Sequence, residues 1–233
     1  MISIPSFTSE ELLLIASVAD GVPGEWIERA REAGLDWIEF RIDRFSSADQ
    51  KRVLEERARY ADLPVLATLR TQQEGGEWAG SEKERLALFE AVLPDVEAAD
   101  IELSSEEIRE GVLEVAREFG KTTIVSFHDF EATPEFPALT ECVNRARALG
   151  ADAVKIATWC RDRTDLQTLA RLTIEMSEEP LITIGMGPYG KASRVLLPAL
   201  GSAATYTYLG KSTAPGQWTL EETVSLLQTL GLR

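Results

Sequence analysis

The chain has 233 residues, and 24 Lys and Arg against 39 Asp and Glu give it a formal net charge of −15 at pH 7. This acidic balance argues against nucleic acid or an anionic membrane surface as a partner. The single His excludes a zinc site built on several His ligands, and the two Cys form no metal or redox motif. We therefore expect a reduced, cytoplasmic setting. Only six of the 24 basic residues are Lys, which leads to the hypothesis of a salt-adapted surface.

The N-terminal part of the chain contains no basic residue before Arg29, and its apolar run over 12–16 is too short to span a bilayer. We expect neither a signal peptide nor a membrane anchor there.

Apolar runs alternate with amphipathic runs along the whole chain. The apolar runs predict strands over residues 12–18, 37–43, 64–70, 100–103, 122–127, 153–157, 181–185 and 205–208. Helical periodicity predicts helices over residues 25–33, 48–60, 82–93, 105–119, 139–149, 166–176, 191–200 and 220–230. Eight strands that alternate with eight helices favour an α/β fold with a parallel sheet closed as a TIM (β/α)8 barrel. Because no Pro-, Gly- or Ser-rich linker interrupts the chain, we predict a single domain over residues 1–233.

Two helix starts carry explicit signals: Ser81 is followed by Glu84, and Ser105 is followed by Glu106. The alternative architecture is an open doubly wound sheet. Such sheets often carry a Gly-rich phosphate motif after the first strand, and residues 20–24 (Asp-Gly-Val-Pro-Gly) do not match one. The barrel is therefore favoured.

In a barrel of this type the chemistry lies at the C-terminal ends of the strands. Charged residues are uncommon in barrel interiors, yet nearly every predicted strand here contributes an ionisable residue. On strand 37–43, alternation places Glu39, Arg41 and Asp43 on one face. Internal ion pairing, such as Glu39 with Arg41 or Arg70, could explain single cases, and we favour it for Glu102. The complete set indicates an active site instead.

Lys155 lies between Val154 and Ile156 in an apolar strand, where an unpaired ammonium group is costly. Desolvation and nearby cations lower the pKa of such a lysine, and a neutral amine can attack a ketone to form an imine. The alternative is a structural ion pair with Asp100 or Glu102. The position of Lys155 alone does not decide between these interpretations.

His128 closes the preceding strand, where it could act beside Lys155 as a general base and acid. Asp129, Asp100 or Glu74 could set its tautomer. A lone histidine at a strand end is commonly a capping residue, but the neighbouring lysine strand favours a catalytic role. Because His128 is the sole histidine, any imidazole titration near neutral pH in a rate profile is expected to belong to it.

Three arginines lie near strand ends: Arg41, Arg70 and Arg194. Guanidinium groups suit a carboxylate, which they can bind in bidentate fashion. Arg194 also lies early in a predicted helix, where the helix dipole favours an anion. Ion pairing is the alternative for each arginine alone. Further side chains that could bond ligand hydroxyls are Ser17, Thr213 and Gln217.

Together these motifs resemble those of the type I 3-dehydroquinate dehydratases, enzymes of the shikimate pathway of aromatic amino acid biosynthesis. The resemblance covers nearly the whole chain, and its motifs follow one another in order at the predicted strand ends. Each motif is weak alone, but the ordered set is specific. The motifs are Glu39-Phe40-Arg41-Ile42-Asp43, Thr68-Leu69-Arg70 with Glu74-Gly75-Gly76, Asp100-Ile101-Glu102-Leu103, Ser126-Phe127-His128-Asp129-Phe130 with Thr133-Pro134, Val154-Lys155-Ile156-Ala157, Met186-Gly187 with Ser193-Arg194, and Ala214-Pro215-Gly216-Gln217.

The resemblance implies a lyase that dehydrates 3-dehydroquinate to 3-dehydroshikimate without a metal or organic cofactor. It implies that Lys155 forms an imine with the substrate ketone and that His128 removes the adjacent proton and protonates the departing hydroxyl. It also implies that Glu74 and Asp100 place or tune the histidine and that Arg194 binds the substrate carboxylate. The further substrate contacts that it implies are Ser17, Glu39, Arg41, Arg70, Thr213 and Gln217, with Thr213 where family members often have Ser.

The resemblance further implies a homodimer and a shortened N-terminal closure of the barrel floor. The loops 75–76 and 212–217 are candidate lids, because small residues permit closure. Two other functions stay open. A class I aldolase would use Lys155 to break a carbon–carbon bond, but the sequence shows no phosphate-binding motif, which disfavours this alternative. A non-catalytic binding barrel is disfavoured by the intact pair of Lys155 and His128.

Overall fold

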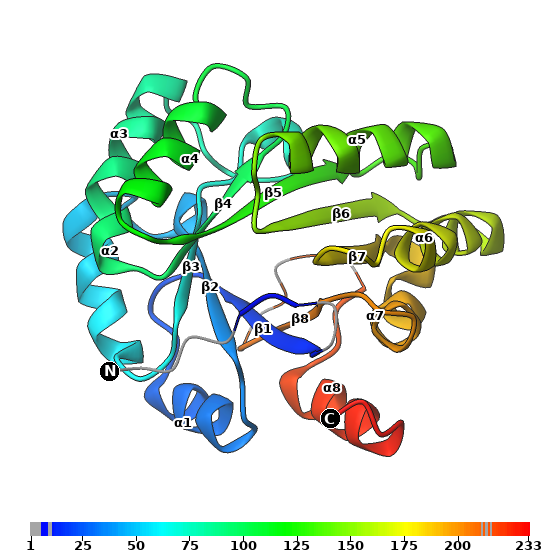
Figure 1. The fold of residues 1–233 in the computed structure, drawn as a ribbon. Coiled ribbons are helices and arrows are strands. Elements are labelled where there is room, and N and C mark those ends of the chain that lie inside the picture. The colour runs from blue at the N-terminus through cyan, green and yellow to red at the C-terminus, as the bar shows by residue number, and fades with distance from the viewer. Residues whose placement is uncertain (1–5, 9–10, 211, 213, 215) are drawn as a thin grey trace.

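The computed structural model describes residues 6–8, 11–210, 212, 214 and 216–233. Within these residues eight parallel strands form one sheet in the order β7-β6-β5-β4-β3-β2-β1-β8. The sheet curves round so that β7 and β8 lie beside each other, with the helices on the outside (Figure 1). The strands are β1 (Leu13–Val18), β2 (Trp37–Arg41), β3 (Val65–Thr68), β4 (Ala98–Glu102), β5 (Thr122–Asp129), β6 (Ala153–Trp159), β7 (Leu181–Met186) and β8 (Ala204–Tyr208).

The seam between β7 and β8 is bridged by individual hydrogen bonds. The Ala203 N–H donates to the Leu181 carbonyl at 2.9 Å, and the Thr183 N–H donates to the Ser202 hydroxyl at 3.0 Å. The barrel is therefore nearly closed. The predicted barrel is confirmed, and the open doubly wound alternative is wrong.

Each predicted helix is present in the described part of the chain, with ends that differ by a few residues. Ser81 forms the predicted capping box with Glu84 at the start of α3. The helices are α1 (Gly24–Glu32), α2 (Gln50–Arg57), α3 (Glu82–Val92), α4 (Arg109–Glu118), α5 (Phe136–Ala148), α6 (Arg163–Glu175), α7 (Gly190–Ala199) and α8 (Leu220–Thr229).

Two predicted boundaries are wrong for identifiable reasons. The strand predicted over 37–43 ends at Arg41, and Ile42–Arg44 form a 3₁₀ turn, so Asp43 does not continue the alternation. The helix predicted from Ser105 starts at Arg109. The Ser105 hydroxyl bonds Glu102 and Arg85 instead of capping the helix.

Alternation along the strands separates two apolar clusters. Outward-facing strand residues such as Leu14, Val154 and Ile156 pack beneath the helices. Inward-facing residues such as Trp37 and Ile124 fill the interior of the barrel. Phe7 joins this interior cluster, and its ring centroid lies 5.7 Å from that of Trp37. The N-terminal segment thus contributes an aromatic side chain to the barrel floor.

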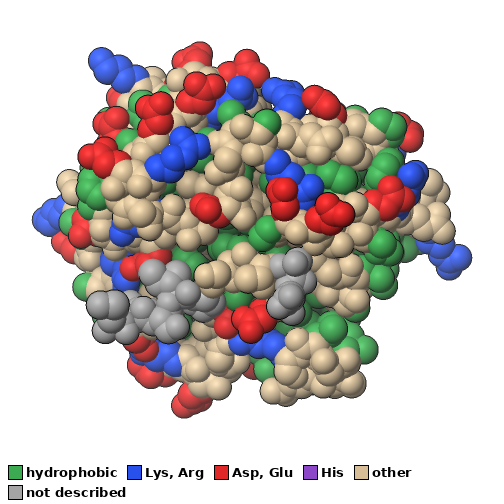
Figure 2. Space-filling model, viewed as in Figure 1, with side chains coloured by type: hydrophobic (Ala, Val, Ile, Leu, Met, Phe, Trp, Pro, Cys, Tyr) green, Lys and Arg blue, Asp and Glu red, His purple; other side chains and the backbone are tan. Residues whose placement is uncertain are grey.

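Acidic and basic side chains are interspersed on the face of the molecule shown in Figure 2. This mixture accompanies the net charge of −15 and differs from the continuous basic patch that nucleic-acid binders present. Among the described residues, no helix is both long and apolar enough to cross a membrane.

Candidate active site

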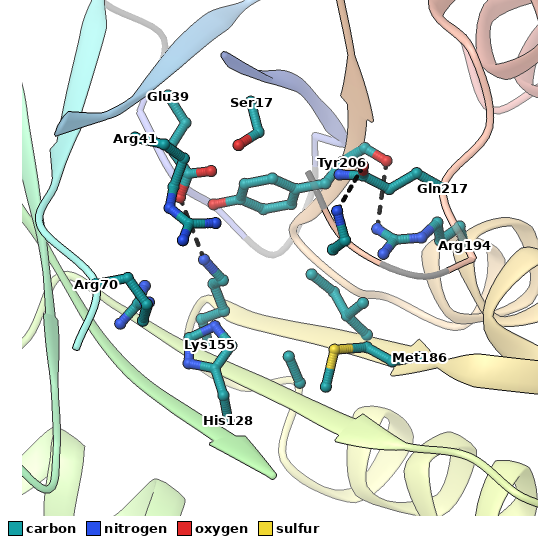
Figure 3. Close-up of a pocket in the computed structure, with 13 residues that line it drawn as sticks. Ser17, Glu39, Arg41, Arg70, His128, Lys155, Met186, Arg194, Tyr206 and Gln217 are labelled. Atoms are coloured by element: carbon teal, nitrogen blue, oxygen red, sulfur yellow. Dashed lines mark hydrogen bonds and ion pairs between the residues drawn. The ribbon is translucent and has the colours of Figure 1, made fainter. Parts of the chain in front are cut away.

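A pocket lies at the C-terminal ends of the strands, inside the barrel wall. Its lining side chains converge from strands far apart in the sequence, and Figure 3 shows them directed toward a common centre. This is where the barrel prediction located the chemistry. The lining residues are Ser17, Glu39, Arg41, Arg70, His128, Lys155, Ala157, Ile184, Met186, Arg194, Tyr206, Ala214 and Gln217.

Lys155 projects into this pocket from β6 and is 5% exposed. Its Nζ lies 2.9 Å from Asp100 Oδ2 and 3.5 Å from Glu39 Oε1. The ion pair with Asp100 that the structural interpretation anticipated is therefore present. The same amine also borders the pocket, so the pairing holds the nitrogen in place without removing it from a ligand.

His128 and Glu74 form a close pair. Glu74 Oε2 lies 2.9 Å from His128 Nδ1 and also accepts the His128 backbone N–H at 2.9 Å. Glu74 reaches this position from the 3₁₀ turn Gln72–Glu74, which ends at Gly75 with a φ of 74°. Of the three acids expected to orient the imidazole, Glu74 contacts it, whereas the Asp129 carboxylate accepts backbone N–H groups of its own loop. With Nδ1 bonded to the carboxylate, Nε2 is left as the proton acceptor.

Burial and the neighbouring charges of Arg70 and Lys155 lower the pKa of His128 well below its ordinary value. Burial raises the pKa of Glu74 to about 7, although Arg70 and the Ser104 hydroxyl oppose that rise. That any imidazole titration belongs to His128 stays a prediction, and the direction of its pKa places that titration below neutral pH. The buried pocket disfavours both the imidazolium and the ionised form of the carboxyl group that orients the ring.

Arg70 is the centre of a buried ion network. It contacts Asp100 at 2.7 Å and Glu102 at 3.0 Å, and it donates to the Ser126 hydroxyl at 2.8 Å. Burial alone would raise the pKa of Asp100, but Arg70 and Lys155 hold it well below its usual range. Glu102 also pairs with Arg85 at 2.9 Å, so its predicted ion-pair role is confirmed. The network keeps these acids ionised in the barrel.

Arg41 and Glu39 extend from β2. The Arg41 guanidinium binds both carboxylate oxygens of Asp43, at 2.9 and 2.8 Å. Burial opposes ionisation of Asp43, but this pairing lowers its pKa. Glu39 contacts Lys155 and accepts the Thr68 hydroxyl at 3.1 Å. The suggested pairing of Glu39 with Arg41 is thus replaced by separate partners for each residue.

Arg194 differs from the other two arginines. It is 3% exposed, and its guanidinium donates to the backbone carbonyls of Gly216 at 2.9 Å and Tyr206 at 3.3 Å. No carboxylate within the described residues pairs with it. Burial lowers the pKa of Arg194 to about 10, so it stays cationic at neutral pH. Arg194 therefore offers the pocket a positive charge that the protein itself does not neutralise.

Hydroxyl and amide groups complete the pocket. The Ser17 hydroxyl is buried without a hydrogen-bond partner in the described part of the chain. Gln217 accepts the Ser212 hydroxyl at 2.9 Å and the Ala214 N–H at 3.1 Å, which ties these two residues to the start of the segment before α8. Thr213, also predicted as a substrate contact, lies outside the described residues.

Sequence reasoning gave no role to Tyr206, Ile184 or Met186, which also line the pocket, although Met186 stands in one of the family motifs. It also gave no role to Ser126, a motif residue whose hydroxyl donates to Asp100 at 2.6 Å. For Ser126 the available signal was strand alternation, because it lies two residues before His128 on β5. The strands β7 and β8 carry no charged residue that would fix their inward face in the same way. Among the described residues no group of three or more His, Cys, Asp or Glu could hold a metal ion.

Comparison with known proteins identifies the family of this chain. The sequence pattern of the Type I 3-dehydroquinase family matches residues 24–233. The 3-dehydroquinate dehydratase of Methanococcoides burtonii is 34% identical over 226 residues, covering 95% of this chain and 96% of that protein. The chain belongs to the type I 3-dehydroquinase family. The predictions of this family and of this enzyme are thereby confirmed.

Solved structures extend the likeness to three dimensions. The 3-dehydroquinate dehydratase of Aquifex aeolicus superposes with a TM-score of 0.84 at 34% identity, covering 94% of this chain and 98% of that one. The type I enzyme of Clostridium difficile, determined with covalently modified comenic acid, gives a TM-score of 0.85 at 30% identity, covering 94% and 92%. Both likenesses run through the barrel that carries the pocket.

Proposed function

We propose that this enzyme converts 3-dehydroquinate to 3-dehydroshikimate, in the shikimate pathway, through an imine on Lys155, with His128 as general base and acid. The observation that carries this proposal is the arrangement of an amine, a carboxylate-oriented imidazole and an unneutralised guanidinium around one pocket (Figure 3).

Imine formation requires an unprotonated amine at Nζ. Asp100 and Glu39 hold this nitrogen at the pocket wall, so its approach to the ketone carbon is fixed. The neutral amine attacks C3 and a C–N bond forms. The ketone oxygen takes the two amine protons and departs as water, and the imine nitrogen takes up one proton from the solvent. The resulting iminium withdraws electrons and makes the proton on C2 acidic.

His128 then transfers the protons. Its Nε2 takes the C2 proton, and the electron pair forms an enamine. When this pair returns, the C1–O bond breaks, and the imidazolium gives its proton to the hydroxyl that departs as water. Water hydrolyses the product imine and restores the Lys155 amine. The Glu74 carboxylate supports this cycle because it stabilises the proton on Nδ1.

Arg194 binds the substrate carboxylate in this proposal. Arg41 and Arg70 are already paired with Asp43, Asp100 and Glu102, so their guanidinium groups are better suited to orient substrate oxygens than to supply net charge. Ser17, Glu39 and Gln217 are proposed as further substrate contacts, together with Thr213.

Borohydride trapping tests the mechanism. Reduction in the presence of 3-dehydroquinate is expected to add the substrate mass to the peptide that contains Lys155. Lys155→Ala is expected to abolish the adduct, and His128→Ala is expected to keep the adduct while dehydration is largely lost. An active preparation that forms no adduct would exclude the imine route. Tight binding of 3-dehydroquinate without turnover would instead favour the non-catalytic barrel.

We further propose that residues 1–233 act as one catalytic domain, that the enzyme works in the cytoplasm and that it is a homodimer. The family resemblance supports this assembly. Analytical ultracentrifugation is expected to give twice the chain mass of 25.7 kDa, and a species at the single-chain mass would contradict the dimer.

A further inference from the structure

Tyr206 is a buried pocket residue that the mechanism above does not use. It lies in the middle of β8 and is 3% exposed. Its ring centroid is 4.6 Å from Lys155 Nζ. Its hydroxyl has no hydrogen-bond partner within the described part of the chain. Figure 3 shows the ring crossing the pocket above the lysine, with the hydroxyl directed toward the side where Glu39 and Arg41 lie.

An unpartnered buried hydroxyl is unfavourable unless a ligand satisfies it, because the group has lost its bonds to water. A phenylalanine would fill the same volume without this cost. The Ser17 hydroxyl is in the same condition, buried and without a described partner. Ser17 comes from β1, which pairs with β8 and aligns Ile15 with Tyr206. Two orphan hydroxyl groups on adjacent strands therefore face one pocket.

The Tyr206 ring also acts on the lysine. A cation over an aromatic face is attracted by the ring quadrupole, and the attraction is stronger in a desolvated site. Together with Asp100 and Glu39, the ring gives the Lys155 nitrogen a third fixed neighbour. An iminium retains the positive charge at the same atom, so the ring continues to stabilise it.

The hydroxyl of Tyr206 is available as a neutral donor. Burial, and then the carboxylates of Glu39 and Asp100, raise its pKa well above the ordinary value. The phenol therefore stays protonated through the working range and does not serve as a base. Donation to a ligand oxygen is the chemistry left to it.

We propose that Tyr206 is a positioning and substrate-recognition residue: its ring holds the Lys155 nitrogen for attack, and its hydroxyl, with that of Ser17, binds an oxygen of a polyhydroxylated carboxylic acid. This inference rests on the proposed function, because it takes Lys155 as the attacking amine.

Tyr206→Phe separates the two roles, because it keeps the ring and removes only the hydroxyl. The KM for 3-dehydroquinate is expected to rise about fivefold, the usual effect of one lost neutral hydrogen bond, while kcat changes little. The melting temperature is expected to hold or rise, since no described partner is stranded. Tyr208→Phe, the same change two residues along β8 at a position that does not line the pocket, is the matched control.

Tyr206→Leu removes the ring and is expected to slow borohydride-trapped adduct formation at Lys155 by about tenfold or more. An unchanged KM with a lowered melting temperature in Tyr206→Phe would overturn the recognition role, because that pattern describes a hydroxyl bonded within the protein. Should Tyr206→Leu fail to fold, Tyr206→Phe decides alone. Absence of any adduct in the active parent enzyme would refute the proposed imine on Lys155, whereas a difference between the variants concerns Tyr206 only.

Discussion

The pH dependence of the reaction is expected to be governed by Glu74, because the pKa of this carboxyl is raised to about 7. Above that pH the carboxylate accepts the Nδ1 proton of His128, and Nε2 is free to act as base. As the pH falls through 7, Glu74 gains a proton and can donate to Nδ1, which moves the ring proton onto Nε2. The base is then lost although the imidazole is still neutral.

The size of the effect follows from the fraction of ionised Glu74. For a single titration near 7, that fraction is about one tenth at pH 6 and about one hundredth at pH 5, and kcat/KM for dehydration is expected to fall in proportion. His128 is expected to contribute less to this limb than Glu74, because burial and the charges of Arg70 and Lys155 lower its pKa well below the ordinary value. The assay is the ultraviolet absorbance of the conjugated enone formed from 3-dehydroquinate, between pH 5 and 9 at constant ionic strength.

Glu74→Gln tests the assignment. The amide oxygen can still accept the Nδ1 proton, but it does not titrate and carries no charge to stabilise the imidazolium. We expect kcat/KM about 10²-fold lower at pH 8, with a flat acid side, so that the two profiles converge near pH 5. Glu131→Gln, an exposed change in the loop after β5, is the control. An acid limb near pH 7 that survives in Glu74→Gln would refute this reasoning.

Three further outcomes are expected. Arg194→Gln should raise the KM by about 10- to 100-fold with little change in melting temperature, because it leaves no carboxylate of the described residues unpaired. Arg70→Gln should lower the free energy of unfolding by about 3 kcal/mol or more, because it leaves the buried Asp100 and Glu102 without their partner. Equal melting temperatures in the two variants would contradict this contrast. Gly75→Ala should destabilise the fold by about 2 kcal/mol and lower kcat, since the new methyl group would overlap the Phe130 ring. Gly120→Ala is the control in a thermal melt: with a φ of 62° and open space around it, it measures the stability lost through backbone strain alone. A salt-adapted surface predicts a melting temperature that rises from dilute buffer to molar KCl, and an unchanged value would count against it.

The architecture could be predicted because period-2 and 3.6-residue patterns alternate along the whole chain. The buried parallel strands appear as short apolar runs, and the helices show one apolar stripe. The local ends were less predictable. Ser105 has the residue type of a helix cap, but its hydroxyl is used by the buried Arg85 and Glu102, whose approach depends on the tertiary fold. A capping signal competes with such partners, and the sequence does not reveal them.

The glycines before α3 illustrate the same limit. Small residues over 75–76 predict a mobile lid, which stays a prediction, and the structure adds a second reason for glycine there, close packing. A Cβ at Gly75 would overlap the Phe130 ring, and one at Gly76 would overlap the Arg70 carbonyl. These contacts hold the turn that carries Glu74 against the strand end. Glycine in a sequence indicates freedom of conformation or nearness of a neighbour, and only the fold distinguishes the two.

The three arginines show why a site's residue list is easier to predict than the division of roles within it. All three suit a carboxylate, and their order in the chain does not separate them. Arg41 and Arg70 extend from the barrel wall, where Asp43 in the following turn and Asp100 on the next strand come within hydrogen-bond distance. Arg194 extends from α7, where its guanidinium donates to backbone carbonyls. Of these three arginines, Arg194 is the one without a carboxylate partner among the described residues, so its positive charge can attract an anionic substrate to an acidic protein. That property arises from the spacing of the helices and strands.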